Sequence, residues 1–65
     1  MLIKKSITLK KHRTSLSLEE EFWAALSKIA ENKNLSIESL ICEIDINRKS
    51  SLASSTRVFI LKYFE

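Results

Sequence analysis

Two kinds of hydrophobic pattern follow each other along this chain. Residues 12–18 alternate between apolar and polar positions, with Leu16 and Leu18 on one side of an extended segment. The polar side chains on the other side are those of Arg13, Ser15 and Ser17. A period of two is typical of a half-exposed β-strand, so this segment is predicted to be one. Residues 1–11 alternate only weakly, at Ile7 and Leu9, and we interpret them as a partly extended arm in front of the strand.

From Leu18 onward the period becomes helical. Apolar residues recur on one face of an amphipathic helix predicted over residues 18–32, at Phe22, Ala25, Leu26, Ile29 and Ala30. Ser17, with Glu20 three residues later, fits a capping box at the start of this helix. Asn34 tolerates the left-handed backbone conformation that ends many helices, so the helix is expected to end just before it.

A second helix is predicted over residues 36–47, with Ser36 as its natural N-cap. Its apolar face is formed by Ile37, Leu40, Ile41 and Ile44. The last segment, residues 51–64, fits a third helix capped by Ser50 or Ser51. Its run of Val, Phe, Ile, Leu and Tyr is also strongly β-prone. The hydrophobic pattern alone leaves this segment open.

The composition limits the chemistry available to the chain. At 65 residues it is one small domain, and it has neither Gly nor Pro. Glycine-dependent sites such as P-loops, dinucleotide-binding turns and nucleophile elbows are therefore excluded. A single cysteine, Cys42, and a single histidine, His12, allow no intrachain disulfide and too few ligands for a structural zinc, so no metal or cofactor is expected. Without a catalytic cluster, the chain is not expected to be an enzyme.

The hydrophobic runs of the chain are short. None is long enough to span a membrane, and the first residues lack the apolar core of a signal peptide. The sequence therefore predicts a cytoplasmic protein with a free thiol and no membrane partner.

Charge is divided unevenly along the chain. The first 17 residues contain five basic residues and no acidic one, whereas the remainder contains six basic and eight acidic residues. A basic segment in front of a mildly acidic body favours contact with a polyanion such as nucleic acid. A charge run of this kind is more often only a solvated surface, so charge by itself does not decide the function.

The predicted strand 12–18 needs a partner, because its backbone groups would otherwise stay unpaired on both edges. No second strand of equal quality is evident in the chain, so the same strand of another copy is the expected partner, paired antiparallel about a two-fold axis. The dimer would also enlarge the core of a very small domain. The side chains predicted to form this dimer core are Leu16, Leu18, Phe22, Leu26, Ile29, Leu40, Ile41 and Ile44.

An antiparallel two-stranded ribbon fits the major groove of B-DNA. The outward side chains predicted to contact bases are those of Arg13, Ser15 and Ser17, each present twice in the dimer. Arg bonds bidentately to guanine, and Ser either donates or accepts. The lysines of the arm, Lys10 and Lys11 among them, are placed to reach phosphates on either side of the ribbon, and the free N–H groups of the helix that starts at Ser36 form a second phosphate site.

The aromatic residues are assigned mainly structural roles. Trp23 lies beside the apolar stripe of its helix and is expected to close the dimer core or to pack on the third helix. Phe59, Tyr63 and Phe64 are expected to be core and dimer contacts.

Two blocks of the chain are His12-Arg13-Thr14-Ser15-Leu16-Ser17-Leu18-Glu19 and Glu21-Phe22-Trp23-Ala24-Ala25-Leu26, followed by the Asn34-Leu35-Ser36 turn and a second helix. Over about residues 5–64, this arrangement resembles the ribbon-helix-helix DNA-binding family, which includes the Arc and methionine repressors. The two blocks look more closely like a subgroup of small bacterial members. The resemblance implies a mainly α fold, in which one short strand pairs with its dimer mate and is followed by two helices and a third over residues 51–64. By position, it also implies base contacts from Arg13, Ser15 and Ser17 and a phosphate clamp at Ser36 and the backbone N–H of Ile37.

The function predicted from these observations is sequence-dependent DNA binding by a homodimer, as a transcriptional regulator or repressor. One alternative is the antitoxin of a toxin–antitoxin pair, whose partner would be the toxin. Another is a dimeric module that binds a protein partner and no nucleic acid. The two alternatives differ from the leading prediction in the partner that should be captured.

Overall fold

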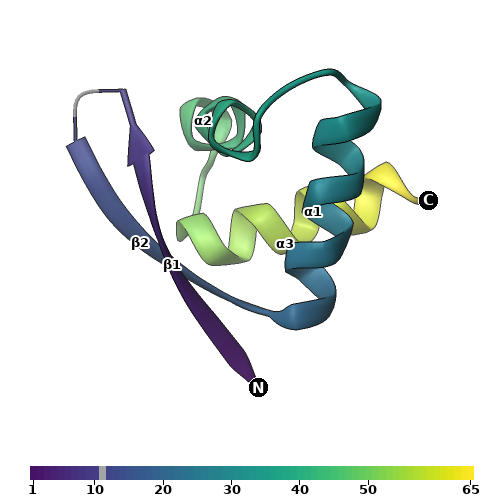
Figure 1. The fold of residues 1–65 in the computed structure, drawn as a ribbon, viewed down its shortest axis with the longest axis horizontal. Coiled ribbons are helices and arrows are strands. Elements are labelled where there is room, and N and C mark those ends of the chain that lie inside the picture. Colours follow the sequence, from purple (N-terminus) through teal and green to yellow (C-terminus); the bar gives the residue numbers. More distant parts are fainter. Residues whose placement is uncertain (11) are drawn as a thin grey trace.

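The fold consists of a β-hairpin followed by three helices (Figure 1). The structure, a computed structural model, describes residues 1–10 and 12–65. The strands are β1 (Leu2–Leu9) and β2 (His12–Glu19), and the helices are α1 (Glu20–Asn32), α2 (Ile37–Asn47) and α3 (Leu52–Tyr63). The hairpin forms one layer, and the three helices pack together on its apolar side (Figure 1). The chain is therefore mainly α, as predicted.

Strand β1 occupies the segment that the sequence predicted to be a partly extended arm; the segment is extended, but it is a paired strand of the fold, so its description as an arm is wrong. The strand pairs antiparallel with β2 along its whole length, from Leu2 opposite Glu19 to Leu9 opposite His12. The weak alternation has a physical cause, because a lysine stands at an inward position of the strand. The Lys5 ammonium lies 5.0 Å from the centre of the Trp23 ring, where a cation is attracted to the face of the indole. A charged residue therefore occupies an inward position of the strand, where an apolar residue would normally reveal the strand in the sequence.

The hairpin connection is short. Leu9 and His12 face each other in register, so only Lys10 and Lys11 connect the strands. Lys10 has a φ of 53°, and the two-residue turns that match the twist of a hairpin need positive φ. Lys11, one of the predicted phosphate contacts, lies outside the described residues.

Strand β2 thus has a partner within its own chain on one edge. The expectation that the chain holds no second strand for it is wrong, and so is the argument that both of its edges need a second copy. The other edge of β2 has no strand beside it among the described residues.

The core lies between the hairpin and the helices. Its buried members on the strands are Ile7, Leu9, Leu16 and Leu18, and those on the helices are Trp23, Leu26, Ile29, Ala30, Leu40, Ile41, Ile44 and Ile60. Of the side chains predicted for a dimer core, Phe22 is only half-buried, and the others are buried within the single chain. They therefore need no second copy to leave water, and their part in a dimer stays a prediction.

The start of α1 differs from the prediction. The N-cap residue is Glu19, whose side chain makes no capping hydrogen bond, and the helix begins at Glu20. Ser17 belongs to β2, so the predicted capping box of Ser17 with Glu20 is wrong. The strand continues to Glu19 because its backbone pairs with β1, and this pairing takes precedence over the local capping signal. Glu20 and Glu21 still lie in the first turn, where the helix dipole favours negative charge.

The other helix ends follow the sequence signals. Ser36 caps α2, and its hydroxyl accepts a hydrogen bond from the Ser39 backbone N–H at 3.0 Å. Ser51 caps α3 in the same way, with the Ser54 backbone N–H at 3.2 Å, which decides the open question about residues 51–64 in favour of a helix. Asn34 has a φ of 57°, and the prediction of a left-handed residue after the first helix is confirmed.

The structure adds a contact to the prediction about Trp23 and corrects the one about Tyr63 and Phe64. Trp23 is buried and packs against the hairpin, where its indole N–H donates to the Ile3 carbonyl at 2.9 Å. It therefore joins α1 to β1, a strand that the sequence prediction lacked. Phe59 is half-buried, but Tyr63 and Phe64 are exposed, so these two are not core residues of the single chain.

Replacing Thr56 by valine should stabilise the fold. Thr56 on α3 is fully buried, and its hydroxyl oxygen has no hydrogen-bond partner among the described residues. A buried hydroxyl without a partner destabilises by about 1–3 kcal/mol, and valine has nearly the same shape without the polar atom. We therefore expect Thr56→Val to raise the free energy of unfolding by about 1 kcal/mol, as measured by urea denaturation. Thr56→Ser, which keeps the hydroxyl and removes the methyl group, should destabilise. A less stable valine variant would contradict the prediction.

Candidate nucleic-acid interface

The hairpin presents one polar face to solvent. In register, Lys4 lies beside Ser17, Ser6 beside Ser15, and Thr8 beside Arg13. The alternate positions of both strands point into the core, which is why this face carries no buried apolar residue. The three predicted base contacts on β2 therefore share their face with Lys4, Ser6 and Thr8 of β1. Sequence reasoning counted Lys4 among the lysines of the arm that could reach phosphates, but it missed Ser6 and Thr8, whose only signal was the alternation in β1.

The Arg13 side chain is held in place across the hairpin. Its Nη2 donates a hydrogen bond to Ser6 Oγ at 3.0 Å. Ser6 is directly opposite Ser15 and diagonal to Arg13, at a distance that long side chains span in antiparallel pairs. The guanidinium therefore lies over the polar face and keeps most of its donors free for another partner.

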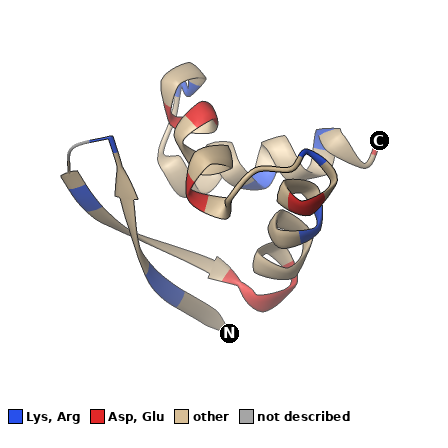
Figure 2. Cartoon of the chain, turned by 45° about the horizontal axis from the view of Figure 1, so that its top comes forward, with Lys and Arg blue, Asp and Glu red and all other residues tan. Residues whose placement is uncertain are grey.

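The charges of the hairpin differ from those of the helices. Basic positions colour the strands, whereas acidic positions appear from the end of β2 and the start of α1 onward (Figure 2). On the polar face itself, Lys4 and Arg13 are the charged residues that precede Glu19. The Glu19 carboxylate is paired, because Arg57 Nε on α3 donates to Glu19 Oε1 at 2.9 Å. The face is therefore positive along most of its length.

The Glu19–Arg57 pair ties the end of β2 to α3. The same guanidinium lies 5.8 Å from the centre of the Phe22 ring, so it contacts α1 as well. Both side chains of the pair keep about a third of their surface exposed, at 31% for Arg57 and 39% for Glu19, so solvent screens their attraction. The Arg57 guanidinium therefore already contacts two side chains of its own chain, those of Glu19 and Phe22.

Acid should weaken the fold through Glu19. The hydrogen bond from Arg57 is the main cause that lowers the pKa of the Glu19 carboxyl below its ordinary value. A carboxyl with a lower pKa in the folded chain than in the unfolded chain stabilises the fold above the unfolded pKa, and this contribution is lost as the pH falls through the folded pKa. The melting temperature should therefore fall less on acidification in Glu19→Gln than in the wild type. Glu21→Gln, at an exposed position of α1, is the matched control and should follow the wild type. Parallel acid curves for all three proteins would contradict this role.

The start of α2 lies beside the hairpin. Glu38, in its first turn, accepts a hydrogen bond at Oε2 from the Thr8 backbone N–H of β1 at 3.0 Å. The predicted phosphate contacts Ser36 and Ile37 are the two residues before Glu38, and they are exposed and half-buried. The Ser36 hydroxyl is already used for capping, so the backbone N–H groups of the first turn are the donors that a phosphate would meet. The nearby Glu38 carboxylate reduces the attraction for an anion there.

The outer edge of β2 is open. Antiparallel pairs alternate between residues that exchange hydrogen bonds and residues whose backbone groups point away from the partner strand. Thr8 is of the second kind, because its N–H reaches Glu38. Its cross-strand partner Arg13 therefore presents its backbone N–H and C=O at the outer edge of β2. Ser15 and Ser17 do the same by alternation. No other segment among the described residues pairs with this edge.

The predicted site residues are distributed over three places. Arg13 and Ser15 are exposed on the polar face of β2, and Ser17 beside them is half-buried. Lys10 is exposed at the hairpin turn. The α2 start, with Ser36 and Ile37, flanks the β1 side of the hairpin through Glu38.

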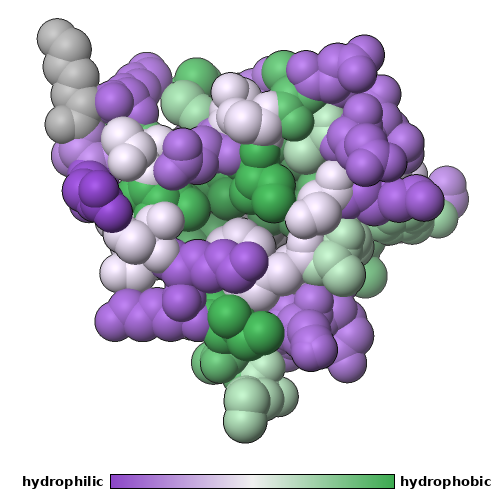
Figure 3. All heavy atoms as spheres, viewed as in Figure 1, coloured by the Kyte–Doolittle hydropathy of each residue, from purple (hydrophilic) through white to green (hydrophobic). Residues whose placement is uncertain are grey.

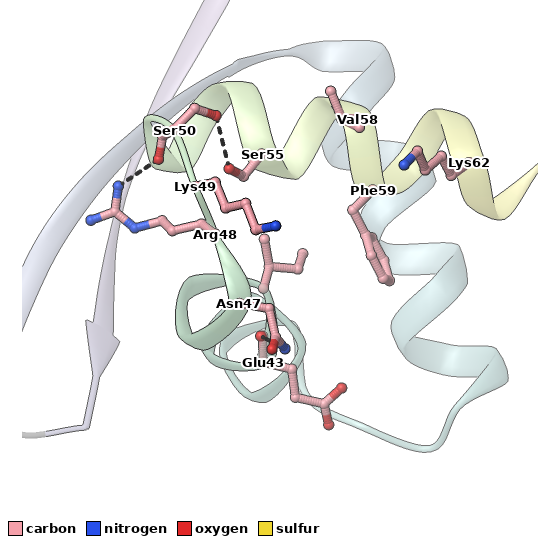
Figure 4. Close-up of a pocket in the computed structure, with 10 residues that line it drawn as sticks. Glu43, Asn47, Arg48, Lys49, Ser50, Ser55, Val58, Phe59 and Lys62 are labelled. Carbon is pink, nitrogen blue, oxygen red and sulfur yellow. Dashed lines mark hydrogen bonds between the residues drawn. The ribbon is translucent and has the colours of Figure 1, made fainter.

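A cavity of about 500 Å³ lies away from these residues, between the end of α2 and α3 (Figure 4). The Arg48 guanidinium lies at this cavity and is held by two contacts. Its Nε pairs with Asp45 Oδ1 at 2.7 Å, and its Nη1 donates to the Ser50 carbonyl at 2.9 Å. The Ser50 and Ser55 hydroxyls meet at 3.2 Å beside it. The cavity is lined by Glu43, Ile44, Asn47, Arg48, Lys49, Ser50, Ser55, Val58, Phe59 and Lys62. It contains none of the predicted DNA contacts.

Hydrophilic side chains cover much of the surface in Figure 3, with apolar atoms visible between the two layers and near the N terminus. The most exposed apolar side chains beyond the first two residues belong to α2, α3 and the residue after it: Ile46, Val58, Leu61, Tyr63 and Phe64.

None of the helices in the described part of the chain has the length and hydrophobicity to cross a bilayer.

The comparisons with known proteins agree with this architecture. A family model described as a ribbon-helix-helix domain matches residues 2–64. No curated protein and no solved structure matches the chain. Members of the matched family are nucleic-acid-binding regulatory modules that generally act as homodimers. The match extends from the start of β1 to the residue after α3, and the chain belongs to the ribbon-helix-helix family of DNA-binding regulators.

Proposed function

We propose that this protein is a homodimeric transcriptional repressor that binds DNA sequence-dependently through its hairpin. The observation that carries the proposal is the open edge of β2, which belongs to the strand that presents Arg13 and Ser15 on a positive face. An edge strand with unpaired backbone groups is a template for another strand. The same segment of a second copy is complementary to it, because an antiparallel pair is symmetric about a two-fold axis.

The two edges of the hairpin are not equivalent, and this favours β2 as the pairing edge. The outer edge of β1 is partly covered, since α2 packs beside it and Glu38 occupies the Thr8 N–H. The outer edge of β2 has no such partner among the described residues. The dimer would then contain a four-stranded sheet in which the two copies of β2 are central and the two copies of β1 are outermost.

The central strands supply the base contacts in this proposal. A pair of antiparallel strands fits the major groove, and the Arg13 guanidinium matches the O6 and N7 acceptors of guanine. The Ser6 hydroxyl supports this role because it orients the guanidinium across the hairpin. Ser15 and Ser17 are short, so they allow close approach to the base edges and add one donor or acceptor each.

Phosphate contacts are assigned to the hairpin turn and the start of α2. Lys10 is exposed at the turn and Lys11 follows it in the sequence. The first backbone N–H groups of α2 after Ser36, with that of Ile37 among them, are suited to a phosphate oxygen. These contacts fix the position of the protein on the duplex without distinguishing its sequence. The cytoplasm is the proposed site of action.

Selection from a random duplex pool tests the proposed function directly. The duplexes retained by the protein should contain two inverted half-sites, because the dimer repeats the same contacts about its two-fold axis. Binding should weaken steeply as salt is added, since bound phosphates release counterions. Retained duplexes without symmetry, or no retention at low salt, would contradict the proposal.

A second candidate function, binding of another protein, has one observation in its favour. The end of α3 exposes large apolar side chains, with 61% of Leu61 and 57% of Phe64 accessible to solvent. Exposed apolar clusters of this kind occur at protein–protein contacts. This function predicts no mobility shift with genomic fragments at low salt and capture of a partner that Leu61→Ser abolishes. A toxin as that partner stays a prediction from the sequence.

A further inference from the structure

We propose that strand β1 takes part in DNA binding and that Lys4 contacts a backbone phosphate at the border of the major groove. This inference rests on the proposed function, because it requires a dimer that places the hairpin against DNA. It adds β1 to the DNA interface. It also assigns different roles to two neighbouring lysines, with Lys4 facing DNA and Lys5 packing on Trp23.

The width of the sheet places β1 over the DNA backbone. Neighbouring strands lie about 4.8 Å apart, so the two outermost strands of a four-stranded sheet are about 14 Å apart. The major groove is about 12 Å wide. The central copies of β2 therefore fit within the groove, whereas each β1 lies above a groove wall, where the phosphates are.

The register determines which side chains of β1 face those phosphates. Lys4 is directly opposite Ser17 on the polar face, in the same row of outward positions as Ser6 and Thr8. Lys5 belongs to the opposite face of the strand, and its ammonium lies over the Trp23 ring. Successive side chains of a strand point to opposite faces, so only the first of the two lysines points toward DNA.

The Lys4 ammonium is also available. The ion pairs among the described residues are Arg48 with Asp45 and Arg57 with Glu19, and neither involves Lys4. Its neighbours along β1 and across from it are Leu2, Ser6 and Ser17, which carry no charge. The diagonal carboxylate of Glu19 is already paired with Arg57. An exposed, uncompensated ammonium in an outer strand is suited to a point contact with a phosphate.

The test compares the salt dependence of DNA binding in Lys4→Gln, Lys5→Gln and Lys28→Gln. Each variant removes one positive charge per protomer, but only Lys4 lies on the polar face; Lys28 is exposed on α1. The logarithm of the binding constant should fall with the logarithm of salt concentration less steeply in Lys4→Gln, by about two for the dimer, while the two controls keep nearly the wild-type slope. Sequence preference should be unchanged in all three, because phosphates carry no sequence information.

The results separate this inference from the proposed function. A wild type that binds DNA together with a Lys4→Gln variant of unchanged slope would overturn the inference and leave the proposed function intact. Equal changes in all three variants would also overturn it, because net charge alone would then account for them. A wild type that binds no DNA would overturn the proposed function itself. Thermal melting of each variant shows whether the fold has survived the substitution.

Discussion

A Ser15→Pro variant should be monomeric and should bind DNA only at the non-specific level, about 10³-fold or more below the wild type. Ser15 presents its backbone N–H at the outer edge of β2, and proline has no N–H to donate. The hairpin itself should survive, because Ser15 and its partner Ser6 form a pair whose backbone groups point away from each other. The substitution thus removes a hydrogen bond that only the dimer uses.

Ser6→Pro is the matched control for the loss of the dimer. Ser6 is directly opposite Ser15 and occupies the equivalent position on the outer edge of β1. Proline there should leave the protein dimeric, since the proposed dimer does not use that edge. Sedimentation equilibrium measures both outcomes. A dimeric Ser15→Pro variant, or a monomeric Ser6→Pro variant, would show that the copies associate through another surface.

Replacing Arg13 by alanine should lower the affinity for the selected DNA site by about 1–3 kcal/mol per half-site and relax the preference for guanine there. The physical reason is the loss of a bidentate pair that alanine cannot replace. Arg13→Lys should restore part of the affinity but little of the preference, because an ammonium is a point charge without the planar fork of guanidinium. Competition binding with sites that carry single base changes measures both quantities.

The contribution of the Ser6–Arg13 hydrogen bond can be measured by comparing Ser6→Ala in the wild type and in the Arg13→Ala variant. Ser6→Ala should reduce the preference for guanine in the wild type and have little effect in the Arg13→Ala background, because the hydroxyl acts through the guanidinium. Unchanged affinity and unchanged preference in Arg13→Ala would show that β2 does not recognise bases in the proposed way.

Much of the helical part of this fold could be predicted because its signals are local. The caps at Ser36 and Ser51 and the left-handed residue at Asn34 depend on side chains within a few residues of each helix end. The third helix differs from the first two, because its β-prone composition left the local pattern open. In the folded chain this segment is a helix that buries Thr56 and Ile60 against the other elements.

The hairpin could not be predicted in the same way, because its evidence is non-local. Lys5 interrupts the apolar alternation of β1, and the Trp23 ring that accommodates it lies in another element. The strand signal of β2 was correctly recognised, but its intrachain partner was missed. The inferred dimer therefore rested on a partnerless strand that the structure does not contain.

By itself, the sequence determined the order of the first two helices, the end of α1, the cap of α2, the β2 strand with Arg13 and Ser15 on its polar side, and the exclusion of glycine-dependent chemistry. The tertiary structure alone decided that β1 pairs with β2, that Ser17 belongs to a strand and caps no helix, and that one edge of β2 stays open. The reason is physical. Helix caps and strand alternation are set by neighbours in sequence, whereas strand pairing and free edges are set by backbone hydrogen bonds between segments that only the folded chain brings together.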